Sequence, residues 1–439
     1  MKKYLFIIIG TIIAFSTFYL FANTQLNCFD LISEYGMTHA LINGEIPYVD
    51  FNTVVPPFFY FFYAPFLLIY DDIIVVLLVT SVLIAVSYYL LYKVLDKKWL
   101  MMIPICSFFL FILYIPTYNY LSFFLIVLLI YLEHYKKNDY LIGVVLALLL
   151  FTKHTIGSPI IVMSFLSIRN FNRIKKRTIS ILSVSLLFLI YFLLTSSLYS
   201  FLDLCVFGLF DFASNSRYIS IFVILIVVSM CLYLIYKIIK TDSFVYYYAL
   251  GSVTFVVPLL DILHFSYFFS LFFFAILYNY KLNKKNLKKY YMIFASLCFI
   301  ILFANIDYRV PFYKNAKVFS ENHFSFYLFD KKTINTFNKI NDIYKQYDNI
   351  YLLSGNNVLH DIINDKKITY YDVLLHGNFG YNGHEKMIKR FNDTHGVYYY
   401  CLNYSKKSVG QYDYQFVEYV REHSEFVSNN KYGVIYYKK

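Results

Sequence analysis

The sequence predicts an all-α membrane domain of about eleven spans, followed by a small external α/β domain. Of the 439 residues, 59% are hydrophobic and only 15% are charged, whereas soluble domains carry about 25% charged residues. Uncharged runs such as 73–91 and 179–194 approach the roughly 20 residues that cross a bilayer. From Asn305 onward no apolar stretch is long enough to span. We therefore divide the chain into residues 1–304 and residues 305–439.

The distribution of charge excludes nucleic-acid binding. The net charge is +12, but the basic residues lie in short clusters between apolar runs, as the positive-inside rule predicts for cytoplasmic loops. The six cysteines are scattered without a C-x-x-C pair, and the histidines show no metal-ligand spacing, so we predict neither a disulfide framework nor a metal site. The partner that the composition does predict is the lipid bilayer.

The same charges orient the spans. Lys2 and Lys3 precede an uncleaved first span at 4–22, which leaves the N-terminus inside and residues 23–72 as the first outer loop. We expect residues 58–70 to lie in the outer interface. The inner loops of residues 1–304 then hold 19 basic and 4 acidic residues, and the outer side holds 2 and 9. The further spans are 73–92, 99–115, 119–133, 140–152, 156–168, 178–198, 218–236, 244–262, 265–280 and 290–304.

By parity, the tail of residues 305–439 lies outside. Short apolar runs predict strands at 349–353, 397–402 and 433–437, and residues 414–424 are typical of a helix. This alternation is typical of a small α/β domain.

The first outer loop carries most of the acidic residues of interest. A short amphipathic helix that lies on the membrane is predicted from the helical spacing of Leu31, Tyr35, Thr38 and Ile42. Gly44 is a helix stop. Asp30 and Glu34 are four residues apart, so both carboxylates are expected on one helix face.

Three segments, taken together, resemble a known family. Asp30 follows the first span and precedes Gly44-Glu45-Ile46-Pro47-Tyr48-Val49-Asp50-Phe51 and then Pro56-Pro57. Two later junctions read Phe151-Thr152-Lys153-His154-Thr155-Ile156-Gly157 and Asp261-Ile262-Leu263-His264. In this order the segments resemble the GT-C membrane glycosyltransferases, and more narrowly the bacterial members akin to protein mannosyltransferases. Where that family often has a second acidic residue beside the first, this chain has Leu31.

The resemblance implies transfer of one sugar, with inversion, from a polyprenyl-phosphate sugar to a glycan, lipid or protein acceptor outside the cytoplasm. The uncleaved first span, the low cysteine content and the overall composition suit a multi-pass protein of the bacterial plasma membrane. No cofactor is assigned, and a divalent-cation requirement stays open. The general base on the acceptor hydroxyl would be Asp30. Substrate binding would fall to Glu34, Asp50, Lys153, His154, Arg217, Asp261 and His264, with the cations and histidines facing the lipid phosphate.

Each candidate also has a structural interpretation. Asp30 could cap its helix, and Asp50 could close the turn after Pro47 and Tyr48. Lys153 could extend its amine to the interface, and Asp261 could bond His264. Two other functions remain open, namely a polysaccharide polymerase or ligase acting on lipid-linked glycans, and a transporter or flippase of lipid-linked oligosaccharides. The scarcity of charge inside the spans disfavours transport.

Overall fold

A computed structural model describes residues 2–21, 29–95, 118–214, 221–256, 262–278, 315–353, 357–368, 370–371, 374, 377–402 and 414–439. The chain contacts divide into two compact units. Unit 1 comprises residues 1–22, 77–188 and 217–314, and unit 2 comprises residues 23–76, 189–216 and 315–439.

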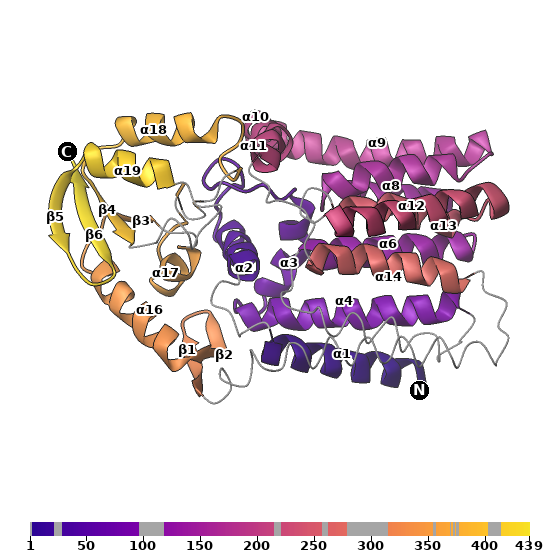
Figure 1. Ribbon diagram of the computed structural model, residues 1–439, viewed down its shortest axis with the longest axis horizontal. Helices are drawn as coiled ribbons and strands as arrows, with labels where there is room; N and C mark the ends of the chain where they lie inside the picture. Colours follow the sequence, from indigo (N-terminus) through magenta and orange to yellow (C-terminus); the bar gives the residue numbers. More distant parts are fainter. Residues whose placement is uncertain are drawn as a thin grey trace. The chain divides into compact units, whose positions relative to one another are not determined.

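Unit 1 is built from helices that run alongside one another (Figure 1). These are α1 (Lys2–Phe21), α4 (Ile73–Val94), α6 (Tyr118–His134), α7 (Asp139–Leu150), α8 (His154–Leu166), α9 (Phe171–Leu194), α12 (Ile221–Thr241), α13 (Phe244–Gly251) with the 3₁₀ turn η4 (Ser252–Phe255), and α14 (Ile262–Tyr278). The first turns of α4 and the last turns of α9 belong to unit 2.

Three helices in the described residues are long and apolar enough to cross a membrane, which indicates a membrane-associated protein. They are α4, α9 and the segment Ile224–Thr241 of α12. This is fewer than the eleven predicted spans, because helices such as α7 and α8, with 12 and 13 residues, fall short of the roughly 20 residues a span needs. The predicted spans 99–115 and 290–304 and the boundary at 304/305 lie outside the described residues.

Unit 2 begins with the first outer loop. Its helices are α2 (Phe29–Ile42) and α3 (Phe58–Leu67), joined later in the chain by α10 (Leu198–Phe201), the π-helix η3 (Leu202–Phe207) and α11 (Gly208–Ser214). The predicted helix at 30–42 is therefore confirmed, and Gly44 follows it with a φ of +90°. Its predicted position on the membrane surface is wrong, because residues 31–38 are all buried inside the protein.

The tail contributes a hairpin and a mixed sheet to unit 2. Strands β1 (Ala316–Glu321) and β2 (Phe324–Asp330) pair antiparallel. The second sheet has the order β3-β4-β6-β5, where β3 (Ile350–Leu353) and β4 (Val397–Leu402) are parallel and β6 (Gly433–Lys438) and β5 (Glu425–Asn429) are antiparallel to their neighbours. The predicted strands at 349–353, 397–402 and 433–437 and the helix at 414–424 are thus confirmed.

Helices cover both faces of this sheet (Figure 1). Tyr399 and Cys401 of β4 pack with α18 (Gly383–Asp393) and α19 (Tyr414–Glu422), whereas Tyr400 and Leu402 pack with α16 (Lys331–Tyr344). Successive strand residues point to opposite faces, so the fully apolar run of β4 is explained by burial on both sides.

The first outer loop and the tail share one unit. The short tail helix α17 (Val358–Ile363) packs on α2. A Cβ atom at Gly36 would collide with Val358 and would come within 2.8 Å of Ile362. Glycine at position 36 is therefore what allows the two helices to approach.

We expect Gly36→Ala to destabilise unit 2 by about 1–3 kcal/mol, because overpacking forces the contacting backbones apart. Circular dichroism melting of the full chain in detergent measures the loss. The double variant with Val358→Ala removes the colliding methyl groups and should regain part of it. Equal melting temperatures for wild type and Gly36→Ala would contradict this contact.

The buried imidazole of His360 predicts acid sensitivity. Burial lowers the pKa of His360 from 6.5 to about 3. The unfolded chain therefore takes up this proton first as the pH falls, and stability is lost between pH 6.5 and about 3. We expect the melting temperature to fall less steeply with acid in His360→Gln than in wild type. The exposed His395 supplies the control, and His395→Gln should follow wild type. Parallel curves for all three proteins would refute the assignment.

Candidate functional site

The Gly-x-x-Pro-Tyr-x-Asp-Phe segment folds into a closed turn in unit 2. Tyr48 has a φ of 71°, its amide donates to the Phe51 carbonyl at 3.0 Å, and its buried hydroxyl donates to the Val55 carbonyl at 2.7 Å. The exposed Asp50 carboxylate accepts the Ile46 amide at 2.6 Å. Asp50 therefore closes the turn, which is the structural role considered for it from the sequence.

The two carboxylates of α2 have different surroundings. Asp30 is exposed in the first turn, whereas Glu34 is only 3% exposed. The four-residue spacing is kept, but only Asp30 presents its carboxylate to solvent. Asp30 is held in a fixed position, because the residues directly after it are buried.

The Thr-Lys-x-x-Gly junction in unit 1 connects α7 to α8. The Lys153 carbonyl accepts the amides of Ile156 and Gly157, and a Cβ at Gly157 would lie 2.6 Å from the Leu150 nitrogen. Glycine at position 157 therefore allows α8 to begin close to the end of α7. In this connection the Lys153 amine lies against Asn119.

The polar groups of this junction gather near the start of α8. The Lys153 amine donates to Asn119 Oδ1 at 2.6 Å and lies 4.9 Å from the ring centre of Tyr118. Both ring nitrogens of His154 are buried and have no hydrogen-bond partner among the described residues. His264 is buried in α14. Arg217 and Asp261 lie outside the described residues.

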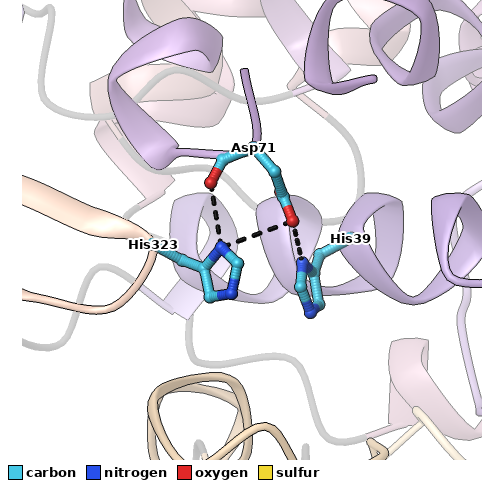
Figure 2. A group of neighbouring side chains, drawn as sticks. All are labelled: His39, Asp71 and His323. Carbon is cyan, nitrogen blue, oxygen red and sulfur yellow. Dashed lines mark hydrogen bonds and ion pairs between the residues drawn. The ribbon is translucent and has the colours of Figure 1, made fainter. Parts of the chain in front are cut away.

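A histidine–aspartate cluster in unit 2 was not predicted from the sequence. Asp71, just before α4, is contacted by His39 from the last turns of α2 and by His323 from the β1–β2 turn (Figure 2). His39 Nδ1 lies 2.7 Å from Asp71 Oδ2, His323 Nδ1 lies 3.3 Å from the same oxygen, and Tyr35 donates to Asp71 Oδ1 at 3.0 Å. Because these residues lie on three distant segments, spacing along the chain gives no signal for them.

The contacts of Asp71 also set its charge state. Burial raises the pKa of the Asp71 carboxyl, but the hydrogen bond and charge of His39, the hydrogen bond from Tyr35 and the charge of His323 together outweigh burial. The pKa of Asp71 therefore lies below its usual value, and the group is an anion at neutral pH.

No known protein family matches this chain, and no curated protein matches it as a relative.

A second cluster that was not predicted from the sequence lies in unit 1. It is an ion-pair network that joins neighbouring helices. Arg177 is fully buried and bonds Glu133 at 2.5 Å, Asp139 at 2.7 Å and Ser164 at 2.6 Å. Arg173 bonds the same two carboxylates. From the sequence, these arginines are predicted only as members of the basic clusters of cytoplasmic loops. The presence of Glu133 and Asp139 in loops that are otherwise basic could have indicated an ion-pair network.

We expect Arg177→Met to destabilise the protein by about 3–5 kcal/mol, because the buried Glu133 and the partly buried Asp139 lose one of their two arginine partners. Arg169 is the matched control, since it is also paired, with Asp242, but is 87% exposed. Arg169→Met should change stability by less than about 1 kcal/mol. Melting of both variants in the same detergent is the measurement, and equal losses would refute the role of burial.

Proposed function

We propose that this chain is a membrane glycosyltransferase that moves a single sugar from a polyprenyl-phosphate donor to an acceptor outside the cytoplasm, with inversion. The observation that carries the proposal is the solvent-exposed carboxylate of Asp30, held at the start of a buried helix soon after α1. A carboxylate in such a position can take the proton from an acceptor hydroxyl. The acceptor class would be a cell-envelope glycan, a lipid or a protein.

The groups at the α7–α8 junction support a phosphate-binding role. Lys153 offers an amine positioned by Asn119 and by aromatic rings. The buried ring nitrogens of His154 lack a partner among the described residues, and a buried polar group of this kind calls for a ligand or a water molecule. An amine and an imidazole can stabilise a departing lipid phosphate.

We further propose the predicted multi-pass topology, with the N-terminus inside and the tail outside the bacterial plasma membrane. Its support is the charge arrangement within unit 1. Glu133, Asp139 and Arg177, all assigned to the inner side, contact one another.

Asp30→Asn should abolish transfer while it leaves donor binding intact. We expect a loss of about 10²–10⁴-fold in rate, the usual contribution of a general base. Purified protein in nanodiscs is supplied with radiolabelled synthetic polyprenyl-phosphate sugars and a cell-envelope extract, and label that leaves the lipid fraction is counted. Asp393→Asn, at an exposed residue of α18, is the control. Lys153→Met should instead weaken donor binding.

Other outcomes separate the alternatives. Full transfer by Asp30→Asn would overturn the base assignment. Release of whole glycan chains would indicate a polymerase or ligase. Movement of labelled lipid-linked sugar across vesicles without transfer would indicate a flippase. A folded protein that neither binds nor turns over any polyprenyl-phosphate sugar would refute the proposal.

A further inference from the structure

The cluster of His39, Asp71 and His323 has the donor atoms of a metal site. We propose that it binds one zinc-like divalent transition-metal ion through His39 Nδ1, Asp71 Oδ2 and His323 Nδ1. Each of the three residues offers one ligand atom, and these atoms lie within 4.8 Å of one another. In Figure 2 the His39 Nδ1 faces the Asp71 carboxylate, whereas the His323 Nδ1 faces both that carboxylate and the Asp71 backbone carbonyl, which is 2.9 Å away. Ligands about 2.0–2.2 Å from one zinc ion lie roughly 3–3.5 Å apart, close to the 2.7 and 3.3 Å found here.

The three donor atoms come from rigid and well-supported positions. His323 has a φ of 64° in the two-residue turn between β1 and β2, and this left-handed conformation is uncommon outside glycine. Neighbouring bonds hold the turn there: Ile73 donates its amide to the His323 carbonyl at 3.1 Å, and Ser325 donates its amide to Asp72 Oδ2 at 2.8 Å. The imidazole of His323 is therefore positioned against Asp71 by the backbone around it.

Two of the three ligands also have a polar partner on their far side, which is typical of metal sites. Tyr35 donates to the other oxygen of Asp71 at 3.0 Å. The outer nitrogen of His323, Nε2, lies 3.7 Å from the Asp365 carboxylate. Such partners orient the rings and strengthen the ligands, and a chance contact between three polar residues does not require them.

The ligand set indicates the class of ion. Two imidazoles and one carboxylate suit zinc and related transition metals, whereas magnesium and calcium prefer oxygen ligands alone. On binding, each Nδ1 lone pair coordinates the ion, and any proton it carried leaves to solvent. Three protein ligands leave a coordination position for water or an anionic oxygen. Because the ion would join α2, the start of α4 and the β1–β2 turn, it would stabilise the folded chain.

This inference does not depend on the proposed function, since it is tested by metal binding and not by sugar transfer. The full chain is purified without a histidine tag in detergent, stripped with chelator and titrated with Zn²⁺ alone by calorimetry. Co²⁺, added separately, reports ligand geometry through its visible spectrum. We expect one zinc bound per chain, a higher melting temperature with zinc, and a Co²⁺ spectrum with nitrogen and oxygen ligands.

Variants decide whether the named residues bind the ion. His323→Gln and Asp71→Asn should abolish the binding and the zinc-induced stabilisation, whereas His395→Gln should keep both. Tyr35→Phe removes only the outer hydrogen bond and should weaken zinc binding about 10–100-fold. This variant keeps the test decisive if the ligand variants do not fold. No zinc bound by wild type, or equal affinity in wild type and Tyr35→Phe, would show that the cluster is a hydrogen-bonded contact only and would overturn the proposal.

Discussion

The packing of α2 on α17 is the contact on which unit 2 depends. α2 has 14 residues, which is marginal for an isolated helix in water, and its residues 31–38 are buried. The burial is completed by a tail segment far along the chain, which approaches closely because residue 36 is glycine. The first outer loop is therefore ordered together with the tail, and the carboxylate of Asp30 takes its position from that joint core.

The polar contacts of unit 2 follow from the same arrangement. Once α2 and the tail are packed, the β1–β2 turn reaches the residues before α4, where Asp71 and Asp72 accept its hydrogen bonds. A carboxylate as enclosed as Asp71 needs such partners, because burial of an unpaired charge is costly. The hydrogen bonds that satisfy Asp71 also bring together two imidazoles, and these three groups make the candidate metal site.

Unit 1 is held by a different constraint. Arg177 is fully buried, and a buried guanidinium is stable only if its charge and donors are matched. Its partners come from α6, α7 and α8, so the network fixes how these helices meet α9. At the other end of α7, the connection to α8 is closed through Gly157, and this places the Lys153 amine beside Asn119.

The features that depend on local patterns could be predicted from the amino-acid sequence. Apolar runs predicted the helices of unit 1, helical spacing and Gly44 predicted α2, and short apolar runs predicted β3, β4 and β6. The sequence also singled out Asp30 and Lys153 as candidates. Three features could be learned only from the folded protein: α2 is buried, Glu34 is enclosed while Asp30 is exposed, and His39, Asp71 and His323 lie together. The physical reason is that periodicity and propensity act over neighbouring residues, whereas burial and ion pairing are set by segments that the fold alone brings into contact.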